Sequence, residues 1–264
     1  MGAHAKGFIE IIDGVETSQP RKKTRRTRQG GVPEATGRVI KSKFQDESYL
    51  AIPVTAKNDV QKQFLNALKE FDVVVFSAPA GVGKSYLTMS EASDWLKKGL
   101  YDKITLSRAV IPMGRSLGML PNNLQQKFEP FLMPLLEVLW KRYGKSYYEN
   151  CLANGSIELL APEYARGRSV SDVMIIDEVQ CMDQNELYTM LTRMEQGSKL
   201  ILIGDGTGHQ TDIKGVNGIE WLTRFVDKNP ELQKHIKVIT ANSEDIVRGG
   251  LCKAMVQAKE RESK

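Results

Sequence analysis

Two short segments of the sequence carry residue types suited to chemistry on a nucleoside triphosphate. The first, from Ala78 to Ser85, reads APAGVGKS. Its glycines let the backbone wrap closely, so that N–H groups point at phosphates, and a following helix adds the positive end of its dipole. Lys84 is predicted to reach the β- and γ-phosphates, and Ser85 to offer its hydroxyl to Mg²⁺. The predicted nucleotide contacts are Ala80, Gly81, Val82, Gly83, Lys84, Ser85 and Tyr86.

The second segment, residues 173–178, reads VMIIDE. Four apolar residues predict a buried strand that exposes two acids at its carboxyl end, where ligands bind in open α/β sheets. We expect Asp177 to hold Mg²⁺ and Glu178 to act as the base that orients water. Alone, the segment could equally be a strand that ends in a solvated acidic loop. A kinase of the P-loop class needs only the aspartate. The adjacent glutamate therefore favours hydrolysis of ATP by water over transfer of its phosphate to a small acceptor.

Strands and helices alternate along the chain from about residue 50. Short β-branched or aliphatic runs predict strands at 73–76, 104–107, 157–160, 173–176, 200–203 and 236–240. Apolar residues at three- and four-residue spacing predict helices at 58–71, 84–98, 123–143, 185–195, 219–226 and 245–259, with Pro130 and Pro134 breaking or kinking the long one. This alternation predicts an α/β fold with a mostly parallel sheet and helices on both faces.

Charge divides the 264-residue chain into a basic segment and a larger, slightly acidic body. Residues 20–43 carry nine basic side chains and one acidic, a net charge of +8 against +5 for the whole chain. We therefore expect a poorly ordered basic segment at 1–45, able to contact polyanions, and a single domain at 46–264. Scattered cysteines indicate a reducing, cytoplasmic setting, and no apolar run is long enough for a membrane span or a secretory signal.

Several further motifs carry a family resemblance. They are the run from Arg108 to Leu120 (RAVIPMGRSLGML) followed by Pro121, YARGRS from Tyr164, DEVQ from Asp177, LTR from Leu191, GSK from Gly197 and GD from Gly204. In this order they resemble the PhoH-like family, over about residues 55–256. The resemblance implies a RecA-like P-loop NTPase core, similar to the first motor domain of superfamily 1 helicases, with ATP and Mg²⁺ as its ligands.

The resemblance also implies roles for single residues. Gln61 matches a glutamine that reads the adenine edge, and Gln180 a residue beside the catalytic acids near the γ-phosphate. Arg193 and Arg248 match arginines that face a γ-phosphate. The chain departs from the family at the γ-phosphate sensor, because its glutamine, Gln210, comes two residues late in the run GDGTGHQTD. The family pattern usually has glycine where this chain has Ala78.

The resemblance leaves the biological role open between two classes. One is an ATP-driven, helicase-like motor on RNA or single-stranded DNA, contacted by the basic segment and by the loop around Arg166 and Arg168. The other is an ATP-controlled switch or assembly protein that unwinds nothing, and a small-molecule kinase is a third, weaker alternative. With room for one core, we expect a homo-oligomeric ring, a hexamer, in which Arg193 or Arg248 completes a neighbour's site. The first 50 residues are too short and too basic for the RNA-cleaving domain of some relatives.

Overall fold

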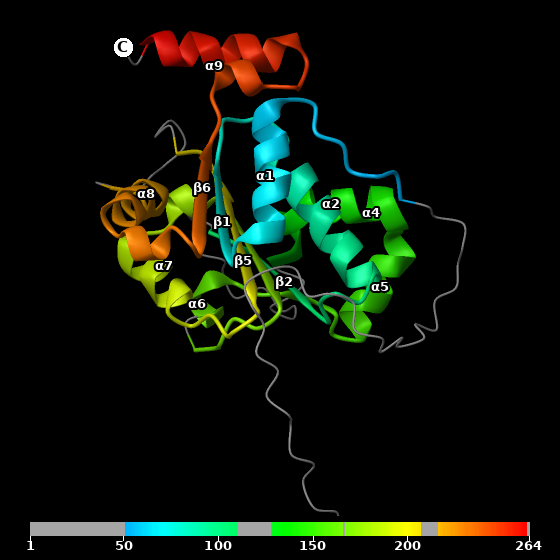
Figure 1. The fold of residues 1–264 in the computed structure, drawn as a ribbon. Helices are drawn as coiled ribbons and strands as arrows, with labels where there is room; N and C mark the ends of the chain where they lie inside the picture. Colours follow the sequence, from blue (N-terminus) through cyan, green and yellow to red (C-terminus); the bar gives the residue numbers. More distant parts are fainter. Residues whose placement is uncertain (1–50, 110–127, 166, 207–215, 263–264) are drawn as a thin grey trace, which may run out of the picture.

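A six-stranded parallel sheet forms the centre of the molecule (Figure 1). The computed structural model describes residues 51–109, 128–165, 167–206 and 216–262. The strands are β1 (Val73–Ser77), β2 (Ile104–Arg108), β3 (Ile157–Leu159), β4 (Val173–Asp177), β5 (Lys199–Gly204) and β6 (Ile236–Thr240). Their order is β3-β2-β4-β5-β1-β6, and every pair is parallel. The prediction of a RecA-like α/β domain is confirmed.

Helices cover both faces of this sheet (Figure 1). One face carries α1 (Asp59–Glu70), α2 (Lys84–Lys97), α4 (Met133–Tyr143) and α5 (Lys145–Ala153). The other carries α6 (Pro162–Ala165), α7 (Gln184–Leu191) and α8 (Gly218–Lys228). The 3₁₀ turns are η1 (Glu129–Leu132), η2 (Val179–Cys181), η3 (Pro230–Leu232) and η4 (Ser243–Asp245), and α9 (Gly250–Glu262) lies across the end of β6.

The central strands are apolar on both faces because both faces are covered. In β4, Val173 and Ile175 join the core beneath α1, α2 and α4, whereas Met174 and Ile176 join the core beneath α7 and α8. Successive side chains of a strand point to opposite faces, so an unbroken apolar run is needed to fill two cores. This explains why the short aliphatic runs located the strands well.

Parallel register brings the carboxyl ends of the central strands to one edge. Ser77 at the end of β1 lies opposite Gly204 of β5, and Arg108 at the end of β2 lies opposite Asp177 of β4. The loop that follows β1 and the acids that end β4 therefore meet at this edge, with β5 between their strands. We call it the carboxyl edge of the sheet, and the opposite one the amino edge.

Several predicted helices have different limits in the structure. The stretch predicted at 123–143 is η1 followed by α4 within the described part, and the break falls at the two prolines, as expected. The helix predicted at 185–195 ends at Leu191, because the chain then joins Val170 in a β-bridge at Met194. The last helix begins at Gly250 and not near residue 245, because the preceding residues cross the phosphate-binding loop.

Some predictions lie outside the described ranges. These include the domain boundary near residue 45, the whole basic segment, Arg166 and Gln210. Within the described ranges, no helix combines the length and the apolar character that a bilayer crossing demands.

Candidate nucleotide site

The predicted phosphate-binding loop joins β1 directly to α2. Gly81 and Gly83 adopt φ values of +89° and +100°, which only glycine adopts without strain. The loop is tied to the sheet because the Ala78 N–H donates to the Gly204 carbonyl at 2.9 Å. Within the described structure, α2 begins at Lys84 with no side-chain cap on its first turn. Its first backbone N–H groups therefore remain available to an anion.

Ala78, where the family pattern usually has glycine, lies inside the core. Its side chain is 1% exposed and belongs to the cluster beneath α1 and α2. The methyl group thus fills space in the core and stays out of the phosphate-binding turn.

Lys84 closes over its own loop. Its ammonium donates to the carbonyls of Ala78 and Pro79. Burial lowers the pKa of Lys84, and the nearby carboxylates of Asp205, Asp177 and Glu178 act in the opposite direction. These three acids thus surround the lysine that the sequence assigns to the phosphates. An anionic ligand in the loop would add the negative charge that stabilises the buried ammonium.

Asp177 and Glu178 end β4 in different environments. Asp177 is 5% exposed, and burial, followed by the neighbouring charge of Glu178, raises the pKa of Asp177 to about 6. Glu178 adopts a left-handed backbone with φ of 56°. A non-glycine residue in this region costs about 1–3 kcal/mol and such residues concentrate at functional sites. The two adjacent carboxylates both lie near the Arg108 guanidinium, at 3.9 Å for Asp177 Oδ2 and 2.8 Å for Glu178 Oε1.

Gln180 connects the acids to the end of β5. Its side chain is fully buried, its Nε2 donates to Glu178 Oε2 at 2.5 Å, and its Oε1 accepts from the Asp205 N–H at 2.9 Å. Gly204 makes room for it: a Cβ there would collide with Gln180 Oε1 and lie 2.8 Å from Ile219 Cδ1. Gln180 therefore lies beside the predicted base, as the resemblance implied.

Arg108 is a member of the site that the sequence assigned no role. Its guanidinium donates to Glu178 Oε1 at 2.8 Å and to the Phe131 carbonyl at 2.7 Å, and lies 3.9 Å from Asp177 Oδ2. The sequence did contain a signal for this role, because Arg108 is a basic residue at the carboxyl end of the otherwise buried strand β2. Its partner at position 178 is seventy residues away and could not be inferred from spacing.

Gln61 contacts the loop from α1. It is 2% exposed, its Nε2 donates to the Val82 carbonyl at 2.7 Å, and its Oε1 accepts from the Lys57 N–H at 2.6 Å. A Cβ on Gly83 would lie 3.3 Å from this amide. Gln61 therefore packs against the phosphate-binding loop, while each end of its amide keeps one further hydrogen-bonding position. Its reading of adenine stays a prediction.

The structure separates the two arginines predicted to face a γ-phosphate. Arg248 lies beside the loop of its own chain, where the N–H groups of Val247 and Arg248 both donate to the Gly81 carbonyl at 3.1 Å. Arg193 is exposed at the amino edge, where its carbonyl accepts from the Val170 N–H at 2.9 Å. Arg193 is thus not brought to the site of the same chain. Tyr86 is 47% exposed on the first turn of α2.

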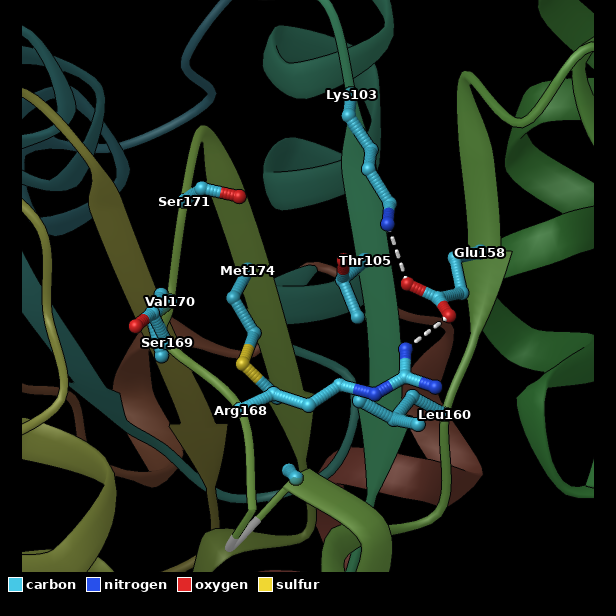
Figure 2. Close-up of a pocket in the computed structure, with 10 residues that line it drawn as sticks. Lys103, Thr105, Glu158, Leu160, Arg168, Ser169, Val170, Ser171 and Met174 are labelled. Atoms are coloured by element: carbon cyan, nitrogen blue, oxygen red, sulfur yellow. Dashed lines mark hydrogen bonds and ion pairs between the residues drawn. The ribbon is translucent and has the colours of Figure 1, made fainter.

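A separate pocket of about 200 Å³ opens near the amino edge (Figure 2). Glu158 of β3 binds both Lys103 and Arg168 at 2.5 Å across its wall, and Met174 and Leu160 line its apolar part. Arg168, predicted to contact nucleic acid, therefore lies here and not beside the phosphate-binding loop. The hollowed part of the surface and the cluster of converging acids lie at different ends of the sheet.

The carboxyl edge fits ATP with Mg²⁺. The backbone N–H groups of the glycine loop and of the uncapped start of α2, together with the partly buried ammonium of Lys84, are donors of the kind that phosphates require. The Ser85 hydroxyl and the Asp177 carboxylate are oxygen donors of the kind that Mg²⁺ prefers, and the phosphates themselves supply further oxygens. No group of three or more metal-binding side chains occurs in the described ranges.

Known proteins resemble this chain in sequence and, more distantly, in structure. A PhoH-like protein of Bacillus subtilis (strain 168) is 33% identical over 212 residues, 80% of this chain and 65% of the relative. Protein PhoH of Escherichia coli (strain K12) is 31% identical over 78% of this chain and 58% of the relative. The chain thus spans about three fifths of the length of these relatives.

Two solved structures align with most of the chain. The large terminase from a thermophilic bacteriophage has a TM-score of 0.48 and 14% identity, over 79% of this chain and 50% of the terminase. The Pif1 helicase from Candida albicans has a TM-score of 0.37 and 17% identity, over 72% and 40%. The sequence model of PhoH-like proteins matches residues 53–260. The chain therefore belongs to the PhoH-like protein family.

Proposed function

We propose that this protein binds ATP with Mg²⁺ and hydrolyses it at the carboxyl edge of the sheet. The observation that carries the proposal is the convergence there of the phosphate-binding loop, its partly buried lysine, and the carboxylates of Asp177 and Glu178. Lys84 and the first N–H groups of α2 bind phosphates, and Gln61 reads the adenine edge. Ser85 and Asp177 would hold Mg²⁺, which would neutralise part of the charge of the phosphates.

The residues of the chain divide the chemical work. Glu178 orients a water molecule and takes one of its protons as the water oxygen bonds to the γ-phosphorus. The bond from that phosphorus to the bridging oxygen breaks, and its electron pair stays on ADP. Gln180 holds the Glu178 carboxylate in place from the buried side. Lys84 balances the charge that builds up on the phosphate oxygens.

Phosphate release from ATP by wild type and Lys84→Ala tests this function. We expect the rate to fall at least about a hundredfold in the variant, since a charged donor is lost at the developing charge. Lys98→Ala, at the exposed far end of the same helix, is the matched control and should keep the wild-type rate. Equal rates in wild type and Lys84→Ala would refute the proposal.

We further propose that turnover is coupled to RNA or single-stranded DNA. The support is the net charge of +8 in residues 20–43 and the exposed side chain of Arg168. The ATPase rate with and without RNA or DNA, over a range of salt concentrations, tests the coupling. Stimulation that fades as salt rises supports a motor. An unchanged rate points to a switch or assembly protein, and a phosphorylated small product points to a kinase.

We also propose a homo-oligomeric ring, a hexamer. Arg193 is exposed far from the site of its own chain, and beside that site α9 exposes Leu251 (78%) and Met255 (64%). Contact between subunits would cover these apolar side chains and bring an arginine to a neighbouring site. Sedimentation with and without ATP tests assembly, and a fully active monomer in both conditions would exclude it.

A further inference from the structure

The predicted base is fully engaged in the structure. Arg108 donates to one oxygen of the Glu178 carboxylate at 2.8 Å, and Gln180 donates to the other at 2.5 Å. The side chains of Arg108 and Glu178 are 24% and 28% exposed, so solvent screens their attraction only in part. A carboxylate whose two oxygens already accept hydrogen bonds from side chains has fewer lone pairs left to orient a water molecule. Arg108 therefore opposes the role proposed for Glu178 in this arrangement.

The position of Arg108 gives it a second possible partner. Arg108 ends β2, the strand beside β4. Its guanidinium lies 3.9 Å from Oδ2 of Asp177, the proposed Mg²⁺ ligand. The hydrogen bond from its NH1 to the Phe131 carbonyl anchors one arm of the fork. The NH2 arm, now on Glu178, can change partners while that anchor holds. An anion bound between Lys84 and Asp177 would compete with Glu178 for this arm, because a phosphate carries more charge than a carboxylate.

We propose that Arg108 is a catalytic residue that moves from Glu178 to the γ-phosphate when ATP binds. The exchange places a guanidinium on the oxygens where charge develops, and it releases Glu178 to accept the proton of water. When ADP is bound, no γ-phosphate competes and the Arg108–Glu178 ion pair reforms. The inference rests on the proposed ATPase function and adds a residue of the same chain that distinguishes ATP from ADP.

Nucleotide affinity tests the competition directly. Calorimetry with the β,γ-imido analogue of ATP and with ADP, both with Mg²⁺, should give unlike results for Glu178→Gln. This change removes the competing charge, so the analogue should bind about tenfold tighter than to wild type, whereas ADP affinity should stay within about twofold. The double variant Arg108→Gln/Glu178→Gln should lose the gain for the analogue and leave ADP unaffected.

Turnover gives the second readout. Arg108→Gln should lower kcat about a hundredfold or more, and Arg108→Lys should restore part of it, because a lysine keeps the charge but not the fork. Arg224→Gln removes a matched arginine–glutamate pair on the surface of α8, whose atoms lie 2.5 Å apart, and should change neither affinity nor rate. Thermal unfolding of each variant shows whether the fold is retained.

Three outcomes would overturn the inference. They are a wild-type kcat in Arg108→Gln, an equal loss of analogue and ADP affinity in the double variant, and no gain of analogue affinity in Glu178→Gln. If Arg108 only stabilised the packing of η1 against β4, the double variant would lose affinity for the analogue and for ADP equally. These outcomes differ from failure of the proposed function, in which wild type itself would not hydrolyse ATP faster than Lys84→Ala.

Discussion

The two edges of the sheet are built from similar side chains and differ in what surrounds them. Each has a lysine that donates to the backbone: Lys84, partly buried, at the carboxyl edge and Lys199, buried, at the amino edge. Each also has an arginine–glutamate ion pair that joins a strand to a loop, Arg108 of β2 to Glu178 and Glu158 of β3 to Arg168. Three carboxylates oppose the lowering of the Lys84 pKa, whereas among the described residues Asp72 is the one that does so for Lys199.

This difference shows that the candidate site is marked by several functional groups meeting around one lysine, and not by the residue types alone. At the carboxyl edge, a helix start, two acids from one strand and a buried glutamine meet around the loop lysine. At the amino edge, Glu158 forms ion pairs with both Lys103 and Arg168, and Lys199 contacts a carbonyl and the ring of Trp95. The amino edge has a pocket, yet the charged side chains that line it already contact one another.

Two glycine-to-alanine changes, one at each edge, should differ most in their effects on turnover and stability. In Gly204→Ala the new methyl group would collide with the Gln180 amide, so we expect ATP turnover to fall about a hundredfold or more and stability to fall by about 1–3 kcal/mol. In Gly167→Ala, near the pocket, the new Cβ has no atom within 4 Å among the described residues beyond its chain neighbours, and both quantities should stay near wild type. Urea unfolding and phosphate release measure them. Equal effects of the two changes would contradict the comparison.

The sequence predicted the parts of this site that depend on local patterns. Short aliphatic runs located the strands. The motif at residues 78–85 follows one of them directly, and the acids of the motif at 173–178 stand at the end of another. Because parallel strands end on the same side of a sheet, the two motifs could be predicted to meet at the carboxyl edge. Contacts that depend on strand order could not be predicted. Arg108 meets Glu178 because β2 lies beside β4, and nothing in the local spacing encodes that neighbourhood.

The contact between the last segment and the loop illustrates the same limit. Apolar spacing placed a helix from about residue 245, but the backbone is extended at Ile246, and the N–H groups of Val247 and Arg248 donate to the Gly81 carbonyl. A Cβ on Gly81 would lie 2.9 Å from Cys252 Sγ and 3.0 Å from Arg248 Cβ. A tertiary partner therefore overrode local helical preference, and only the folded chain reveals why this glycine has no room for a side chain.

The lysine at the amino edge should affect stability and not turnover. Burial lowers the pKa of Lys199 to about 8 from 10.5, with Asp72 acting in the opposite direction. Between these two values the unfolded chain holds the proton that the folded chain has lost, so stability rises as pH rises from about 8. Lys199 should contribute on the order of 3 kcal/mol to this rise in wild type, so the rise should be smaller by that amount in Lys199→Met, as measured by urea unfolding across this range.

Turnover by Lys199→Met gives the control for that prediction. Because Lys199 lies at the start of β5, far along the strand from Gly204, its loss should leave the ATPase rate at neutral pH unchanged. A variant that kept the pH-dependent rise would show that another group is responsible for it. A variant as inactive as Lys84→Ala would show that the two lysines do not differ in role.

The smallest expected effect concerns the second arginine–glutamate pair. Burial acts to raise the pKa of Glu158, but hydrogen bonds from Lys103 and Arg168 outweigh it and hold the pKa below its usual range. A lowered pKa gives stability that is present above the unfolded value of about 4.5 and is lost as pH falls through the folded one. Glu158→Gln should therefore reduce the unfolding free energy at pH 7 by less than about 1 kcal/mol, since such partly exposed pairs contribute little.

Acid unfolding distinguishes this pair from the one in the site. The difference in stability between wild type and Glu158→Gln should shrink as pH falls below the unfolded pKa, because wild type then loses the charge that the variant never had. ATP turnover without nucleic acid should be the same in both proteins, whereas Glu178→Gln should be nearly inactive. A constant difference in stability at all pH values would mean that Glu158 acts by packing. A loss of turnover in Glu158→Gln would mean that the two edges are coupled through β2, the strand that lies between β3 and β4.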